Sequence, residues 1–296
     1  MLPYLILGGA QLAVGAAAIF ARFALSGAGP IAVSAARLAI AAAIVLTVTG
    51  TRRSPQAALA PRQRFTLALA GVALAVHFAT WIASLQFTTV AVSTLLVATS
   101  PIWTALYDAA TRRRALTRPS IVAFAGGGAG LLLVLGFDRA AAPQPGHVLA
   151  GAALALTGAF AFAAYLLLVR TVRAQLDTMR IIGHTYTSGA IVLAAAAVLA
   201  RQPLPAPTNS TAWGGIIAMA LVSQLLGHTG MNAALRWFTP SAISFSTLLE
   251  PIFAAVIALV VFAEPLPPAA ILGGFIVLVA VAIVAREERE TIEPPT

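Results

Sequence analysis

The sequence contains no lysine and no cysteine. Without lysine the chain has no Walker A phosphate loop, because the Gly-Lys-Ser/Thr end of that loop requires the residue. Without cysteine it can form no disulfide, iron–sulfur cluster or thiolate zinc site. The four histidines, at positions 77, 147, 184 and 228, do not have metal-ligand spacing. We therefore expect no cofactor, no bound metal and no process driven by the chain's own ATP hydrolysis.

Charged residues are also scarce. Only 9% of the 296 residues are charged and 60% are hydrophobic, whereas soluble domains carry about a quarter charged residues. The chain divides into about ten apolar stretches, each close to the roughly 20 residues that span a bilayer as a helix. The predicted fold is therefore an all-α polytopic membrane protein without a soluble domain. The expected transmembrane helices are residues 3–24, 30–49, 65–86, 89–108, 118–136, 147–170, 178–200, 212–237, 239–262 and 267–285.

The basic residues are all arginines, and they occur mainly in short clusters between the apolar stretches. These clusters lack the interleaved aromatic residues of a nucleic-acid surface, so the net charge of +9 does not indicate a nucleic-acid partner. If the N-terminus is cytoplasmic, 14 of the 18 arginines fall in cytoplasmic segments and only Arg139 and Arg201 in outer ones. By the positive-inside rule, both termini are predicted to be cytoplasmic.

The second half of the chain repeats the first. The stretch "FTTVAVSTLLVATSPIWTAL" from Phe87 is similar to "FTPSAISFSTLLEPIFAAV" from Phe238, with one inserted residue. We expect a first five-helix repeat in residues 1–140 and a second in residues 141–296, which ends in a short cytoplasmic tail. Because five crossings is an odd number, the second copy must be inverted in the membrane, as in many secondary transporters. The matched pairs are His77 and His228, Ser100 and Glu250, and Pro101 and Pro251.

The stretches "TSP" and "LEPIFAAVIALVVFAEPL", which close the fourth span of each repeat, resemble the EamA-like, ten-helix family of the drug/metabolite transporter superfamily. The likeness covers essentially the whole chain. Members of that family usually have Gly-Glu before the last span of each repeat. Here the second copy has Ala263 and Glu264, and the first has Arg113 and Arg114. The resemblance implies a transporter of small metabolites or drugs, in character most similar to a bacterial exporter of aromatic amino acids.

Polar and aromatic side chains recur at helical spacing inside the predicted spans. An ionisable side chain within a bilayer normally faces the bundle interior or a watery cavity, so these residues are candidates for the substrate path. The alternative for each is a hydrogen bond that only joins neighbouring helices. The candidate substrate-binding residues are His77, Trp81, Thr99, Trp103, Tyr165, His184, Ser188, His228, Ser244 and Glu250.

Pro101 and Pro251 are predicted hinges, because a proline within a span frees backbone groups that only protein or water can satisfy. Glu250 beside the second proline is either a proton-coupling acid or a structural cap for freed backbone groups. Two arginines also lie within spans. Arg22 is predicted to be a snorkelling anchor near the outer end of the first span, and Arg37 to pair inside the bundle.

These features favour a secondary transporter that works by alternating access in the bacterial inner membrane. The expected partners are a small organic solute, an amino acid first among them, and the lipid bilayer. Proton coupling and a monomeric state are both options, and the sequence leaves the oligomeric state open. The alternatives are a drug, nucleoside or other metabolite transporter of the same fold, an intramembrane enzyme, and a packing or sensor subunit. An enzyme is disfavoured because Glu250 has no second carboxylate, lysine or cysteine beside it within the spans.

Overall fold

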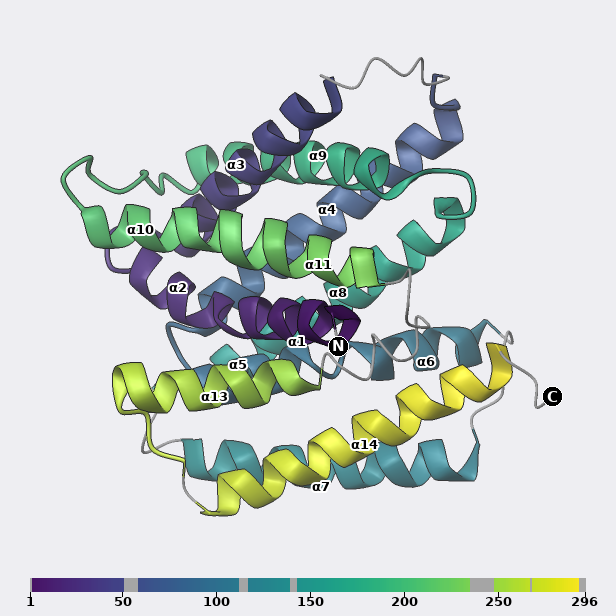
Figure 1. Cartoon of the computed structure of the whole chain (residues 1–296). Coiled ribbons are helices and arrows are strands. Elements are labelled where there is room, and N and C mark those ends of the chain that lie inside the picture. The colour runs from purple at the N-terminus through teal and green to yellow at the C-terminus, as the bar shows by residue number, and fades with distance from the viewer. Residues whose placement is uncertain are drawn as a thin grey trace.

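The computed structural model describes residues 2–50, 58–111, 117–138, 143–234, 248–266 and 268–292. Every regular element within these ranges is helical (Figure 1). The α-helices are α1 (Leu2–Gly15), α2 (Ala17–Ala24), α3 (Pro30–Gly50), α4 (Pro61–Ser84), α5 (Val90–Val97), α6 (Ser100–Ala110), α7 (Arg118–Asp138), α8 (Val148–Val172), α9 (Thr178–Leu199), α10 (Ser210–Ala218), α11 (Thr229–Ala234), α13 (Leu249–Phe262) and α14 (Pro268–Ile292). A 3-10 turn, η1 (Pro145–His147), precedes α8, and a π-helical segment, η2 (Met219–His228), joins α10 to α11.

Seven helical stretches are long and apolar enough to cross a membrane. Three further predicted spans coincide with shorter apolar helices: Ile121–Leu133 within α7, Leu249–Phe262, and Pro268–Ile283 within α14. The all-helical, multi-span fold is therefore confirmed for the described residues, while ten crossings and cytoplasmic termini stay predictions. The seven long stretches are Pro3–Ala24, Pro30–Gly50, Pro61–Ser84, Val90–Ala110, Val148–Val172, Thr178–Leu199 and Ser210–Met231.

The local sequence explains where several helices begin. Pro30, Pro61 and Pro268 are the first residues of α3, α4 and α14, where a missing N–H costs no helical hydrogen bond. Elsewhere a polar side chain caps the helix: Asp177 accepts the Arg180 N–H before α9. Such caps satisfy N–H groups that have no partner inside the helix.

The packing of the helices follows the internal repeat. Three helices pack against their own repeat partners: α3 against α9, α5 against α13, and α7 against α14 (Figure 1). The contact between α4 and α8, the third and sixth spans, has its counterpart between η2 and α1, the eighth and first spans. The same set of neighbours therefore occurs twice, as expected when two copies of one unit pack around a common axis.

Matched helices run in opposite directions. The backbone N–H groups of Ile31 and Ala32, at the start of α3, donate to the side-chain oxygen of Gln202, which follows the end of α9. Between these antiparallel helices and α4 the packing is close: a Cβ on Gly189 would lie only 3.0 Å from the Gly71 carbonyl oxygen. Small residues permit such close approach between membrane helices.

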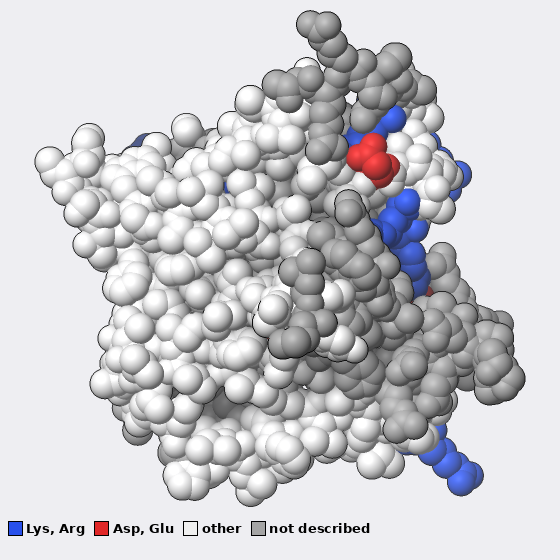
Figure 2. Space-filling model, viewed as in Figure 1, with Lys and Arg blue, Asp and Glu red and all other residues white. Residues whose placement is uncertain are grey.

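The described arginines lie mostly on one side of the molecule, at the ends of the helices. Figure 2 shows the basic side chains along one edge of the visible face, with the opposite side of that face almost free of charge. The starts of α4 and α7 and the end of α8 lie on this side of the molecule (Figure 1), and these helix ends carry Arg62, Arg64, Arg118, Arg170 and Arg173. This asymmetry is consistent with the positive-inside prediction, which would make this edge cytoplasmic.

Candidate functional site

Arg37 lies at the centre of the molecule, in the second turn of α3, and is only 1% exposed. Its Nη2 donates to the side-chain oxygen of Gln224 in η2 at 2.6 Å. Its guanidinium carbon lies 4.0 Å from the centre of the Phe78 ring and 5.9 Å from that of Trp81. Arg37 therefore pairs inside the bundle, as the sequence predicted, and it joins the first repeat to the second.

This guanidinium is only partly satisfied. Among the described residues, neither Nε nor Nη1 of Arg37 has a hydrogen-bond acceptor, although both atoms are buried. The indole N–H of Trp81 is also buried and has no acceptor among the described residues. A buried donor without an acceptor is costly, by about 1 to 3 kcal/mol for a neutral group and by more for a charged one. The part of the chain that the structure describes thus holds several buried N–H donors near Arg37 that it provides with no acceptor.

His77 of α4 lies beside these donors. Its Nδ1 is 2.9 Å from the Gly158 carbonyl oxygen of α8, and since a carbonyl only accepts, Nδ1 carries the proton in this contact. The imidazole is parallel to the Trp81 ring, with centroids 6.1 Å apart, and lies 4.9 Å from the Phe162 ring. Phe162 in turn stacks on Tyr165 at 5.8 Å. A wall of four rings therefore runs from α4 to α8.

The second repeat contributes the remaining polar groups. The π-helical segment η2 carries Gln224 and His228, and π-helical turns are frequent at functional sites. His228 lies close enough to interact electrostatically with both Arg37 and His77. Glu250, in the first turn of α13, interacts electrostatically with Arg37. No ion pair within 4.0 Å joins Arg37 to Glu250, since the pairs found between described residues involve other groups.

We use the term central cluster for this group of residues, which comes from α3, α4, α8, η2 and α13. It contains five of the predicted site residues: His77, Trp81, Tyr165, His228 and Glu250. Sequence reasoning assigned Arg37 no place in the site, and the signal for it was an arginine within an apolar span. The members of the central cluster are Arg37, His77, Phe78, Trp81, Phe162, Tyr165, Gln224, His228 and Glu250.

Other predicted site residues lie elsewhere. Trp103 of α6 contacts the largely exposed Phe160 edge to face at 5.7 Å, and no ring contact or hydrogen bond between described residues joins it to the central cluster. The exposed His184 lies on the outer surface of α9. The hydroxyls of Thr99 and Ser188 donate to carbonyls of their own chain segments, Leu96 and His184 respectively. Ser244 lies outside the described residues.

The two predicted hinge prolines both occupy the first turn of a helix. Pro101 follows a break between α5 and α6, so the predicted fourth span is two helices rather than one. Because Pro101 has no N–H, the carbonyl of Val97 loses its helical donor. The hydroxyl of Ser100 donates to that carbonyl at 2.6 Å. Pro101 is the second residue of α6 and Pro251 is the third residue of α13. Residues 235–247, which precede Leu248, lie outside the described part of the chain.

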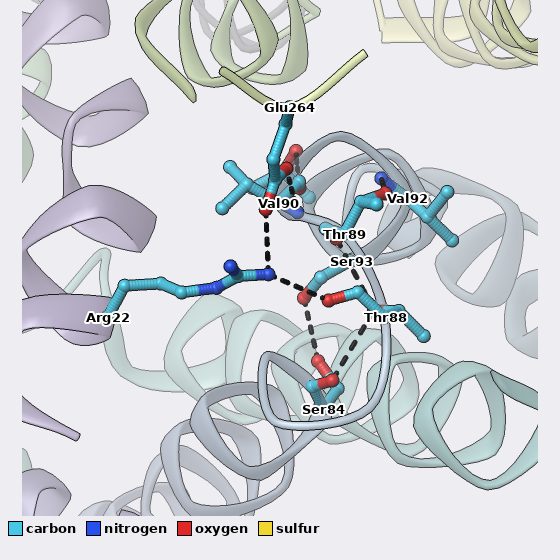
Figure 3. A network of polar contacts seen from close by, with 9 residues as sticks. Arg22, Ser84, Thr88, Thr89, Val90, Val92, Ser93 and Glu264 are labelled. Carbon is cyan, nitrogen blue, oxygen red and sulfur yellow. Dashed lines mark hydrogen bonds and ion pairs between the residues drawn. The ribbon is translucent and has the colours of Figure 1, made fainter. Parts of the chain in front are cut away.

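A second polar network lies where α2 ends (Figure 3). The Nη2 of Arg22 forms an ion pair with Glu264 at 2.8 Å and donates to the Thr88 carbonyl at 3.1 Å. The other oxygen of Glu264 accepts the N–H of Val90, the first residue of α5, at 2.9 Å. The expectation that Arg22 is a snorkelling anchor is wrong, because its guanidinium turns inward to this carboxylate. Glu264, the acid of the Ala-Glu pair, therefore has a clear structural role.

A second ion pair lies where α8 and α6 end. Both terminal nitrogens of Arg170 donate to the Asp108 carboxylate, at 2.8 and 3.1 Å. Like Arg22 and Glu264, these residues belong to different repeats. Sequence reasoning did not find this pair, because the two residues are 62 positions apart and no periodicity links them.

The comparisons with known proteins agree with this geometry. A multi-span helical fold with buried polar groups from both halves of the chain is typical of transporters. The family model described as "EamA-like transporter family" matches residues 1–136 and again residues 149–286, and the chain belongs to this family. The resemblance noted in the sequence is thereby confirmed, and with it a multi-pass membrane transporter of small solutes.

A solved structure described only as "Crystal structure of protein" is similar over 98% of this chain and 98% of its own. Its TM-score is 0.64 and its sequence identity is 17%. At this identity the likeness shows a shared fold. No curated protein matches the chain.

Proposed function

We propose that the protein is a secondary transporter that moves a small organic solute across the bacterial inner membrane by alternating access, as an exporter of aromatic or amphipathic amino acids. The observation that carries this proposal is the central cluster. It holds an arginine and a carboxylate within a largely apolar bundle, and its members come from both repeats. Ionisable groups at such depth are costly and are generally retained where they act on a substrate or an ion.

The aromatic wall supports an aromatic or amphipathic solute. His77, Trp81, Phe162 and Tyr165 present adjacent rings, and ring pairs at 4.5 to 7 Å favour an inserted aromatic group through offset or edge contacts. His77 keeps its other ring nitrogen as an acceptor, because Nδ1 is committed to the Gly158 carbonyl. A solute with an apolar ring and a charged head fits this combination.

The two ion pairs support alternating access. Arg22–Glu264 joins the repeats at the ends of α2 and α13, and Arg170–Asp108 joins them at the ends of α6 and α8. The ends of α2 and α13 lie on one side of the molecule, and the ends of α6 and α8 lie on the opposite side (Figure 1). A transporter that opens to one side at a time must separate its repeats at one end while it holds them at the other. The pairs lie where such contacts are needed.

The test is solute flux in proteoliposomes loaded with a panel of amino acids, nucleosides and lipophilic cations. We expect efflux or exchange of aromatic amino acids, strongly reduced in His77→Ala while the melting temperature is retained. Trp103→Ala serves as a comparison, since no ring contact or hydrogen bond between described residues joins Trp103 to the central cluster. If only nucleosides or only cations are transported, the solute is one of these classes and not an amino acid. Absence of flux for every solute would overturn the proposal.

Glu250 has two candidate roles in this cycle, as a coupling acid or as a structural cap. Glu250→Gln keeps the shape and the acceptor oxygen of the side chain but removes its charge. We expect this variant to retain most exchange down a concentration gradient and its folded stability. Loss of uphill flux driven by a pH gradient, at unchanged melting temperature, would assign the coupling proton to Glu250.

A further inference from the structure

We propose that Arg37 and Glu250 bind the two charges of a zwitterionic solute, the carboxylate at Arg37 and the ammonium at Glu250. The inference rests on the proposed transport function and names the head-group site within the central cluster. It concerns one residue from α3 of the first repeat and one from α13 of the second.

The Arg37 half of the site is indicated by hydrogen-bond geometry. One terminal nitrogen is held by Gln224 at 2.6 Å, which fixes the guanidinium in place. Nε and Nη1 carry N–H groups and are buried without an acceptor among the described residues. The Phe78 ring covers the guanidinium face at 4.0 Å, so an incoming ligand reaches it at its edge. Charge-assisted bonds to carboxylates suit an arginine edge of this kind.

The Glu250 half is indicated by charge. Its carboxylate interacts electrostatically with Arg37 but forms no ion pair with it within 4.0 Å. Two opposite charges in one apolar interior are stabilised when they are paired and fully hydrogen-bonded. A zwitterion between them supplies an acceptor to the arginine and a donor to the carboxylate while the net charge stays unchanged. A solute with a single charge would leave one of the two residues unmatched.

The matched position in the first repeat differs chemically from Glu250. At the matched position, Ser100 donates its hydroxyl proton to the Val97 carbonyl, which Pro101 leaves without a helical donor. An ionised carboxylate has no proton to donate, so Glu250 in its charged form cannot make the bond that Ser100 makes. The second repeat therefore has an ionisable group where the first has a hydroxyl, and Arg37 is the cation with which this group interacts electrostatically.

The experiment measures binding of three probes to the full chain in detergent micelles. Tryptophan carries both charges, tryptamine lacks the carboxylate, and indole-3-propionate lacks the ammonium. The wild type should bind tryptophan at least about tenfold more tightly than either analogue, since each lost charge-assisted bond is worth about 1.4 kcal/mol or more. Equal binding of the three probes by the wild type would overturn the assignment.

The variants assign each charge to its residue. In Arg37→Gln, tryptophan and tryptamine should bind equally, while the preference over indole-3-propionate persists. In Glu250→Gln, tryptophan and indole-3-propionate should bind equally, while the preference over tryptamine persists. Arg37→Lys should keep part of the carboxylate preference, and it replaces Arg37→Gln if the latter does not fold. Arg22→Gln is the matched control, because Arg22 is also an inward-facing arginine but belongs to the Glu264 network, and its probe preferences should equal those of the wild type.

The outcomes separate this inference from the function on which it rests. A carboxylate preference that survives in both Arg37 variants would move the head group elsewhere and leave amino-acid transport intact. Flux of nucleosides or cations without tryptophan binding would overturn the head-group site while transport itself stands. Absence of flux for all solutes would overturn both.

Discussion

The two ion pairs that join the repeats occupy corresponding places yet differ in surroundings. In each, an arginine in the last turn of a helix, α2 or α8, reaches an acid of the other repeat. In the α2 pair, Arg22 and Glu264, the side chains are 19% and 9% exposed. In the α8 pair, Arg170 and Asp108, they are 49% and 17% exposed. The first pair is thus largely shielded from solvent, and the second lies at the surface.

The acids also face different helix ends. Glu264 accepts the first N–H of α5, where the helix dipole favours a negative charge. Asp108 lies in the last turn of α6, where the dipole disfavours it. Both arginines lie at helix C-termini, which suit a cation. The α2 pair therefore also supports the start of α5, whereas the acid of the α8 pair lies at a helix end that disfavours its charge.

The largest expected effect comes from Glu264→Ala. It removes the partner of a shielded Arg22 and the acceptor for the Val90 N–H, and loss of one member of such a pair costs about 3 kcal/mol. We expect a strongly lowered melting temperature in detergent, measured by thermal unfolding. The matched control is Asp108→Ala. If the two variants melt at the same temperature, the distinction between the pairs fails.

Exchange of the charges tests the helix-dipole contribution. Asp108→Arg with Arg170→Asp should recover most of the stability lost in the single variants. Arg22→Glu with Glu264→Arg should recover less than about half, because it places a cation at the start of α5 and an anion at the end of α2. The measurement is a double-mutant cycle on melting in detergent. Full recovery in both cases would show that only the charge attraction matters.

A third prediction extends the comparison of the repeats to Ser100. Ser100→Ala should lower the free energy of unfolding by about 1 kcal/mol, because the Val97 carbonyl loses its donor beside Pro101. Thermal unfolding in detergent measures this loss. The control is Thr111→Ala, which removes a comparable hydroxyl contact to a carbonyl at the exposed end of α6. An equal, small effect in both variants would show that the break at Pro101 needs no hydroxyl.

The smallest effect is expected for Asp108→Asn. An exposed pair contributes about 0.5 kcal/mol, and salt screens it over about 10 Å at 0.1 M ionic strength. We expect a slightly lowered melting temperature at low salt and no difference from the wild type at high salt. Glu264→Gln, in contrast, should stay destabilised at both salt concentrations, and disappearance of its effect with salt would contradict the shielding of the α2 pair.

Most of the fold could be predicted from the sequence, because each bilayer span is a long local run of apolar residues. The apolar stretches predicted the helices, and the matched segments around Pro101 and Pro251 predicted the repeat. The only sequence signal for the helix break at Ala98 and Thr99 was the nearby Pro101. Seven stretches reach spanning length, and part of the predicted ninth span lies in residues outside the structural description.

The candidate site was only partly predictable. His77 and Trp81 share a face by spacing alone, and the structure brings them together. Helical spacing does not say which face of a span meets the bundle interior, so it grouped Trp103 and His184 with them, although Trp103 packs on Phe160 and His184 is exposed. The contact of Arg37 with Gln224 joins residues 187 positions apart.

The sequence by itself determined the class of protein, since scarce charge, apolar stretches of bilayer length and an internal repeat are properties of composition and local order. Only the tertiary structure decided which polar groups meet. In the sequence, Arg37, Glu264 and Asp108 all look alike, because each is an ionisable residue in or beside an apolar span. Their partners, Gln224 for Arg37, Arg22 for Glu264 and Arg170 for Asp108, are set by how the two repeats pack against each other.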